Sequence, residues 1–487
     1  MKNTFRASMA MVHTTLGLIT GWVLFAIALS GALSVFRPEI SLWARPELSA
    51  STVDPLLADA HALDWLSHHA LAADAWYVAG ASNRSFAATA LWPDAKGDYV
   101  QRALDPLTGS PDGIRDTLGG EFFYRFHFEL QLPYPWGRLI AAIAALALVV
   151  GLVTGIIIHR RIFADFFTFR PARGQRSWLD MHNLLGVAAL PFHLMISLTG
   201  AVTLGSLLLP WSTQALYPHD LTTSYREMNP ALYSRPTTGH PAHLAPLLPM
   251  LREARSRFGD AGVEQIYVLN PSDQASLVTI IAGHGGTVST SARVLTFDGP
   301  SGRIIRDYTE NRPVIRTYTF LYGLHVGRFA PGLTRWLYFL SGLALAAVIG
   351  SGMHLWTLKR LRRPHHAGHR MVARLNVGIL MGTPLAFASF FIANRLLPLT
   401  TPQRSRCEVV SVFVVWGVML VYTLLRRPER AWSELLGGNA VACLLVALLS
   451  LPWQNPAIAA VSMTALALSA AFTCATIRMT QKAPILP

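Results

Sequence analysis

Long apolar segments dominate the chain. A helix of about 18 or more consecutive apolar residues is long enough to cross a lipid bilayer. Eight stretches have this character, the last two being the shortest and weakest: 12–36, 138–158, 183–210, 333–358, 372–394, 408–425, 435–452 and 457–477. The first stretch carries His13 and has no convincing small-residue cleavage site, so it is interpreted as an uncleaved anchor and not as a signal peptide.

Two long polar segments interrupt the apolar stretches, and both show the same order of patterns. Each begins with a helical pattern, continues with short runs rich in β-branched and aromatic residues, and contains a D-x3-G turn. The expected elements are helix 55–70, strands near 76–80, 86–92 and 99–104 and turn 105–109, then helix 242–258, strands 263–270, 275–283 and 290–297 and turn 298–302. Each polar segment is therefore expected to form a small α+β domain between two membrane helices.

These patterns predict a mostly α-helical membrane protein with inserted α+β domains. The expected parts are a membrane helix (1–37), a first α+β domain (38–136), membrane helices two and three with a basic loop (137–210), a second α+β domain (211–332), a fourth membrane helix (333–360), and a basic loop with four further membrane helices (361–487).

Composition and charge agree with this interpretation. Only 14% of the residues are charged and 52% are apolar, which excludes a soluble enzyme of this size and a disordered chain. The three cysteines form no CxxC or CxxCH motif, which excludes a disulfide scaffold, a cysteine zinc site and covalently attached c-type haem.

The formal charge of +14 indicates topology and not nucleic-acid binding. With the N-terminus in the cytoplasm, the cytoplasmic tails and loops hold eighteen cations against four acids, as the positive-inside rule expects. The cations are Lys2, Arg6, Arg160, Arg161, Arg170, Arg173, Arg176, Lys359, Arg360, Arg362, Arg363, Arg370, Arg374, Arg426, Arg427, Arg430, Arg478 and Lys482. The two α+β segments then face the periplasm or the exterior.

An internal repeat covers about the first 360 residues. His13-x3-Gly17 is followed by Ser30-Gly31, and His182-x3-Gly186 is followed at the same distance by Thr199-Gly200. The second and fourth apolar stretches run sixteen residues from an arginine, Arg138 or Arg335, to a Thr-Gly or Ser-Gly pair. The copies are therefore parallel units of helix, exterior domain and helix, and the small pairs suit close helix packing in lipid.

Seven histidines lie in or beside the four repeat helices, and ionisable residues inside a membrane are by default functional candidates. They are His13, His127, His159, His182, His193, His325 and His354. Proton relay, buried hydrogen bonding and metal or haem ligation all remain open for them. The other ten, including the HHxxH motif of His365, His366 and His369, are interpreted as ordinary loop or surface residues.

His182 and His193 are eleven residues apart, which in one straight helix places them on the same face with a rise of about 16 Å. That arrangement suits two stacked haems served by one helix. His13, His159 and His354 could supply partners on the cytoplasmic side, and His127 and His325 on the exterior side. The copies differ, however, because Leu24 matches His193 and Trp356 matches His159.

The repeat motifs, with FHFELQLPYPWGR, LHVGRFAPGLTR and WLDMHNLLGVAALPFHLMISLTG, resemble the PepSY-associated membrane-helix family over about residues 8–362. That family includes iron-regulated inner-membrane proteins and ferrisiderophore reductases of the ferrioxamine type. The resemblance implies two periplasmic PepSY domains in a bacterial inner-membrane protein with a cytoplasmic N-terminus. It also implies haem b, expected as two groups, held by the matching histidines His13, His127, His182, His193, His325 and His354. The activity implied is electron transfer to a ferric siderophore.

The chain has no GxGxxG or Walker A motif, so electrons would come from a membrane quinol or a separate cytoplasmic reductase. Reduction of ferric iron to Fe(II) weakens its hard-oxygen ligation and frees it. Two other functions remain open: a non-enzymatic membrane protein whose exterior domains bind or regulate a periplasmic partner, and a transporter with a histidine relay.

Overall fold

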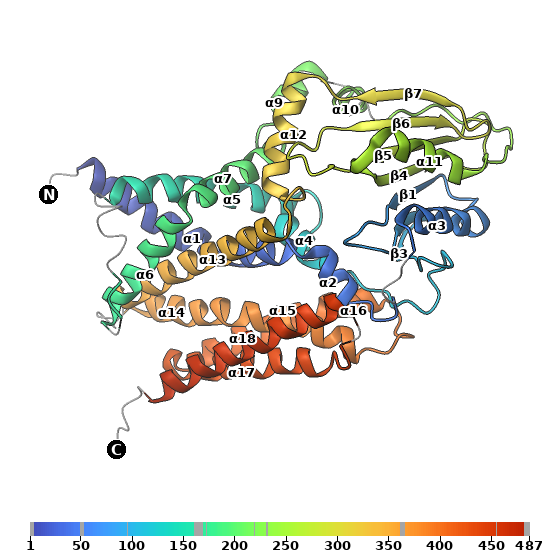
Figure 1. The fold of residues 1–487 in the computed structure, drawn as a ribbon. Coiled ribbons are helices and arrows are strands. Elements are labelled where there is room, and N and C mark those ends of the chain that lie inside the picture. Colours follow the sequence, from blue (N-terminus) through green and yellow to red (C-terminus); the bar gives the residue numbers. More distant parts are fainter. Residues whose placement is uncertain are drawn as a thin grey trace. The chain divides into compact units, whose positions relative to one another are not determined.

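The computed structural model describes residues 4–48, 53–94, 96–159, 169–171, 173–218, 220–229, 232–360, 366–453 and 455–481. The chain divides into two compact units, drawn in Figure 1. The membrane unit consists of Met1–Ala44, Thr117–Leu208 and Gly332–Pro487, and the sheet unit of Arg45–Asp116 and Leu209–Pro331. Seven residues used in the sequence predictions lie outside the described parts: Lys2, Arg160, Arg161, Arg362, Arg363, His365 and Lys482.

Apolar helices build the membrane unit, and seven spans among the described residues are long and apolar enough to cross a bilayer. They are α1 (Phe5–Ser34), α5 (Trp136–Ile158), α13 (Gly332–Arg360), α14 and α15 together (Ala367–Leu380 and Gly382–Leu396), α16 (Arg404–Leu425), α17 (Pro428–Leu448) and α18 (Pro456–Gln481). The prediction of a multi-pass membrane protein is confirmed. The last two spans, weakest in the sequence, are full-length helices.

The third predicted span is not one helix. It consists of α6 (Gln175–Ala188) and α7 (Leu190–Thr203), whose axes differ by 70°. The break lies at Ala189, and Pro191 in the first turn of α7 has no N–H to continue the hydrogen-bond ladder of α6. The expectation that His182 and His193 share one straight helical face is therefore wrong, because the two residues lie on different segments.

Three short helices beside the spans also belong to the membrane unit: α2 (Arg37–Trp43), α4 (Gly120–Glu129) and α8 (Gly205–Leu208). The sequence boundaries had assigned α2 and α4 to the first exterior segment. The structure packs α4 against α1, α2 and α5 instead. Gly119 precedes α4 with φ of +55°, a conformation that glycine adopts without steric cost.

Strands from both polar segments join in one antiparallel sheet of the sheet unit. Its order is β3-β2-β1-β4-β5-β6-β7. The strands are β1 (Ala75–Ala79), β2 (Thr89–Pro93), β3 (Tyr99–Ala103), β4 (Val263–Leu269), β5 (Leu277–Ala282), β6 (Arg293–Asp298) and β7 (Ile304–Thr309). The segments were expected as separate small domains, but β1 pairs with β4, and Tyr77 lies directly opposite Tyr267.

The internal repeat explains this symmetric order. In each copy a helix and three strands occur in the predicted sequence, with α3 (Pro55–His69) and α11 (Leu247–Phe258) as the helices. These two helices pack on each other and share one apolar core with the sheet, in which Trp76 and Ile266 are fully buried. The remaining elements are α9 (Trp211–Leu216), α10 (Leu221–Met228), a 3-10 turn (Gly259–Ala261) and α12 (Pro313–Val326).

Both predicted D-x3-G turns are confirmed. Asp105 accepts hydrogen bonds from the backbone N–H of Leu107 and Thr108, and Asp298 accepts one from Ser301. The glycine that ends each turn has a positive φ and donates its N–H to the carbonyl of the aspartate. Only the second turn leads into a further strand, β7, which the sequence did not predict.

The buried carboxyl of Asp59 on α3 gives the sheet unit a pH-dependent stability. Burial raises the pKa of Asp59 to about 7, against the hydrogen bond of 2.7 Å from the Ala81 N–H. The folded state therefore keeps a proton that the unfolded chain releases near pH 4. Because the folded state favours the protonated form, this proton contributes to the free energy of unfolding. The contribution is complete below pH 4 and is lost as pH rises to 7.

We predict that Asp59→Asn, which keeps the acceptor for Ala81 and cannot ionise, removes this pH dependence. The variant and the wild type should unfold at similar temperatures at about pH 3.5, below the pKa of Asp59 in both states. At pH 7.5 the variant should be more stable by up to about 4 kcal/mol. Thermal unfolding of the full-length protein in detergent at both pH values measures the difference, and a gap that stays constant with pH contradicts the prediction.

Candidate functional site

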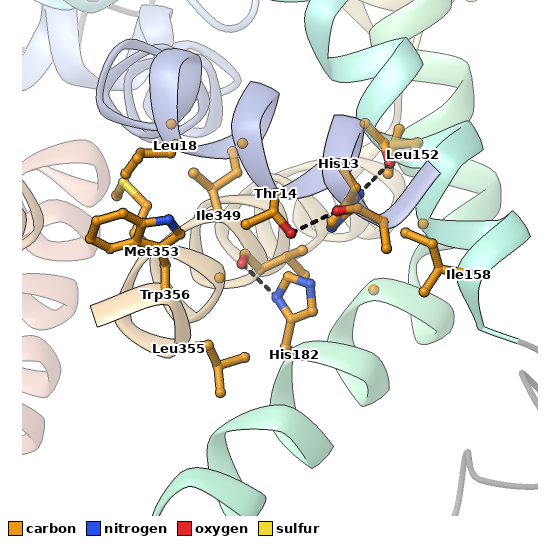
Figure 2. A pocket seen from close by; sticks show the side chains of 18 of the residues that line it. His13, Thr14, Leu18, Leu152, Ile158, His182, Ile349, Met353, Leu355 and Trp356 are labelled. Atoms are coloured by element: carbon orange, nitrogen blue, oxygen red, sulfur yellow. Dashed lines mark hydrogen bonds between the residues drawn. The ribbon is translucent and has the colours of Figure 1, made fainter. Parts of the chain in front are cut away.

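A cavity of about 820 Å³ lies between four helices of the membrane unit: α1, α5, α6 and α13. Its wall is largely apolar and contains three of the predicted histidines, His13, His159 and His182. Figure 2 shows His13 and His182 approaching the space from different helices, with Leu152, Ile349 and Met353 around them. The cavity is thus the place where residues from both repeat copies meet.

The imidazole of His13 is held by α5. Its Nδ1 lies 2.9 Å from the carbonyl oxygen of Gly151 and 3.3 Å from Oγ1 of Thr154. A carbonyl can only accept, so Nδ1 carries the proton and Nε2 keeps its lone pair. The ring lies against Gly155, where a Cβ would be in van der Waals contact with Cε1 at 3.4 Å.

The imidazole of His182 is held by α13 in the same way. Its Nδ1 lies 2.9 Å from the carbonyl oxygen of Val348 and 3.2 Å from Oγ of Ser351. A Cβ at Gly352 would lie 3.1 Å from Cε1 of the ring. Each partner helix therefore has the same contact site for an imidazole, called a seat below. It consists of the carbonyl four residues before a glycine and the hydroxyl one residue before that glycine.

The two seats bring the rings of His13 and His182 close to each other. Their centres are 6.4 Å apart and their planes are inclined by 78°. Within the described parts of the chain, neither Nε2 has a hydrogen-bond partner. Two imidazoles that bind one metal ion from opposite sides, each at about 2.0–2.1 Å, have ring centres about 6 Å apart. The spacing of the two rings is therefore compatible with two imidazole ligands of one metal ion.

Glycines shape the rest of the cavity. Six of them line it, three of which would point a Cβ into open space. The six are Gly17, Gly21, Gly151, Gly155, Gly186 and Gly352. Gly17 and Gly186 stand four residues after His13 and His182, so each keeps the space beside an imidazole free. The H-x3-G motif thus leaves open space next to each imidazole.

Cations line one side of the cavity. Arg6, Lys359 and Arg360 belong to its lining, together with His159 at the C-terminal cap of α5. Arg6 donates from Nε and Nη2 to the carbonyl oxygen of Ile158, the Nε bond being 2.8 Å long. This carbonyl lies in the last turn of α5, where helix carbonyls lack internal partners. The cavity therefore combines an apolar wall with positive groups that suit carboxylates.

His127 on α4 occupies a third seat of the same design, on α1. Its Nδ1 lies 2.8 Å from the carbonyl oxygen of Ile27, four residues before Gly31. A Cβ at Gly31 would lie only 2.6 Å from Nδ1. Ile27 follows His13 by 14 residues, a rise of about 21 Å along α1. The membrane unit thus has imidazoles anchored through Nδ1 at two positions along α1, one near His13 and a second level near Ile27.

The other predicted histidines lie elsewhere. His193 is fully buried on α7, with Nε2 3.2 Å from the carbonyl oxygen of Ser341. His354 is not part of the cavity lining and packs between the indoles of Trp178 and Trp432, with ring centres 4.6 and 5.7 Å away. His325 lies on α12 in the sheet unit. No group of three or more His, Cys, Asp or Glu residues in the described parts could hold a metal ion.

Sequence reasoning missed the role of the Thr-Gly and Ser-Gly pairs. They had been interpreted as close packing in lipid, whereas Thr154-Gly155 and Ser351-Gly352 seat imidazoles. The signal was present, because the spacing from arginine to glycine is the same in both copies. The spacing could not predict which helix packs against each seat.

We predict that Gly31→Ala destabilises the protein, because the added methyl group collides with the ring of His127. Overpacking of this kind typically costs about 1–3 kcal/mol. Gly417→Ala on α16 is the matched control, since nothing lies within 4 Å of its Cβ position, and alanine should be neutral or stabilising there. Thermal unfolding in detergent compares the two variants. Equal stability of both contradicts the close contact between Gly31 and the ring of His127.

Comparison of the sequence with known proteins identifies its family. The family model described as the PepSY-associated TM region matches residues 10–359. An uncharacterized protein of Pseudomonas aeruginosa, PA4219, is 26% identical over 360 residues, which cover 68% of this chain and 87% of the relative. The match contains α1, α5, α13 and all the seats described above, and it ends before α14. The chain therefore belongs to the PepSY-associated TM region family.

Proposed function

We propose that this protein is a haem-containing reductase of a bacterial inner membrane, with its N-terminus in the cytoplasm, which passes electrons across the bilayer to a ferric siderophore. The observation that carries the proposal is the pair of Nδ1-anchored imidazoles, His13 and His182, with ring centres 6.4 Å apart. A haem brings four ring nitrogens of its own and needs only axial ligands from the protein. His13 and His182 would be the residues that hold it.

The surroundings of the pair also support haem. The open space beside Gly17 and Gly186 suits a flat macrocycle, and the apolar wall suits its hydrocarbon surface. Arg6, Lys359 and Arg360 suit its two carboxylates. When bound, the haem iron would accept and release one electron at a time.

The chain's own residues have distinct tasks in this proposal. The carbonyls of Gly151 and Val348 hold His13 and His182 in the tautomer that leaves Nε2 free, as partners of metal-bound histidines commonly do. The apolar side chains of the four helices form most of the wall around the two imidazoles. His127, prepared in the same manner at the second level, is proposed as a ligand of a second haem. His193 and His325 remain predicted ligands from the sequence.

The substrate is proposed from the family resemblance and from iron chemistry. One electron converts Fe(III) to Fe(II), which binds the hard oxygen donors of a siderophore more weakly and is released. The electron would come from a membrane quinol or a cytoplasmic reductase. A reduced preparation that is reoxidised by ferrioxamine, with the Fe(II) captured by a chelator, would be the expected behaviour. A reduced preparation that ferrioxamine does not reoxidise contradicts the substrate.

We predict that the purified protein is coloured and that its Soret band shifts on addition of dithionite. His13→Ala and His182→Ala should each lose one of two haem equivalents, because each removes an axial ligand. His354→Ala is the control and should keep both, because its ring lies between two indoles away from the cavity lining. Haem-to-protein ratios measure these outcomes. A folded and colourless wild-type preparation contradicts the proposal.

A second prediction concerns a substitution that fills the cavity and leaves His13 and His182 unchanged. Gly186→Leu should place a side chain where a Cβ has no neighbour within 4 Å, so the helices can keep their packing while the space for haem is lost. Gly417→Leu adds the same side chain at an equally open position outside the cavity. The first variant should lose one haem equivalent and the second none. Equal haem content in both variants would place the cofactor elsewhere.

A further inference from the structure

The C-terminal helices α14–α18 lie beyond the part of the chain that the family model matches. Their contacts with the repeat helices concentrate on a few elements, among them α1, α13 and the short helix α4 through its aromatic residues. Helix α4 is of special interest because it carries His127.

Three phenylalanines of α4 pack into an aromatic cluster on α15 and α16. Phe122, Phe123 and Phe126 are at most 1% exposed. The ring of Phe122 stacks on Phe390 with centres 4.6 Å apart, and Phe126 meets Phe387 at 5.2 Å. While these side chains contact the C-terminal helices, the neighbouring His127 contacts α1. Helix α4 is thus held between α1 and the C-terminal helices.

A buried polar network holds the segment that leads into α4. Glu408 on α16 is completely buried and forms an ion pair with Arg404, which is 1% exposed. Asn394 on α15 donates to the same carboxylate at 2.9 Å, and Thr117 donates its hydroxyl to the other oxygen of Glu408. A charge at such a position is costly unless its partners are fixed.

Thr117 connects this network to α4. Its Oγ1 accepts the backbone N–H of Gly119 at 3.1 Å, and Gly119 is the N-terminal cap of α4. The next N–H, that of Gly120, donates to Ser41 on α2 at 3.0 Å. A continuous series of hydrogen bonds therefore runs from the carboxylate of Glu408 through Thr117 to Gly119, the N-terminal cap of the helix that carries His127.

We propose that Glu408, acting through Thr117 with the support of Asn394, is a positioning residue for His127. The C-terminal helices then fix the place of this imidazole on α1, and with it the properties of the haem that His127 is proposed to hold. The second half of the inference rests on the proposed function, whereas the placement of α4 does not. The network should have no influence on the haem between His13 and His182.

Glu408→Gln tests the role of the carboxylate in the full-length protein. The variant leaves the buried Arg404 without its counter-charge and weakens the hold on Thr117. Amide hydrogen exchange across Gly120–Glu129 should become at least about tenfold faster than in the wild type. In a reductive titration followed by absorption, only one of the two haem components should shift its midpoint.

Glu434→Gln is the control for loss of a paired carboxylate elsewhere on these helices. Glu434 on α17 pairs with Arg426 and accepts a hydrogen bond from Tyr422 at the other end of α16, and this pair is partly exposed. Neither partner belongs to the network around Thr117. This variant should leave both the exchange of α4 and the two haem components unchanged, and an equal effect of both variants overturns the proposal.

Thr117→Val and Thr117→Ser keep the test decisive if Glu408→Gln fails to fold. Valine has the shape of threonine without the hydroxyl, and serine restores the hydroxyl. The valine variant should reproduce faster exchange in α4 and the shift of one haem component, and the serine variant should restore wild-type values. Wild-type exchange in α4 of the valine variant overturns the proposal.

Two further outcomes separate this proposal from the proposed function. A colourless wild type whose α4 exchanges faster in Glu408→Gln contradicts haem binding but supports the positioning of α4. A coloured wild type in which α4 exchange rises while both haem components keep their midpoints overturns the influence of the network on the haem.

Discussion

The hydrogen bond from a histidine Nδ1 to a helix carbonyl is the interaction on which the membrane bundle depends. A neutral imidazole in an apolar environment needs a partner for its N–H. The bundle provides that partner three times, from the carbonyls of Gly151, Val348 and Ile27. In each case a glycine follows four residues later and leaves the carbonyl open to a ring from another helix. Contact between the ring and an open backbone carbonyl thus determines which helices pack together, which ring nitrogen carries the proton and where Nε2 points.

Much of this arrangement could be predicted from the sequence because it depends on local periodicity. The apolar stretches, the two helix-and-strand patterns and the D-x3-G turns follow from side chains and turn chemistry close together in the chain. The repeat also identified His13 and His182 as related residues. Their pairing needed the structure, since spacing along α1 and α6 does not say which helices become neighbours.

The parts that could not be predicted depend on contacts between distant segments. Pro191 permits a break in the third span, but the bend of 70° is set by the helices that pack on α6 and α7. The same holds for His354, whose indole neighbours Trp178 and Trp432 lie far away in the sequence. In the sheet unit, the pairing of β1 with β4 joins two patterns that each looked like a complete domain.

The two copies of the repeat have the same order of elements but differ in several residues and helix contacts. Helix α1 is continuous and has Leu24 where the broken third span has His193. Helix α4 belongs to the membrane unit and is clamped by aromatic residues of α15 and α16, whereas its counterpart α12 belongs to the sheet unit. In the proposed reductase, the two haem sites would therefore have different surroundings, because the two copies differ at these helices. The helices added outside the repeat contribute to this difference, because they contact the first copy through the phenylalanines of α4 and the second copy through α13.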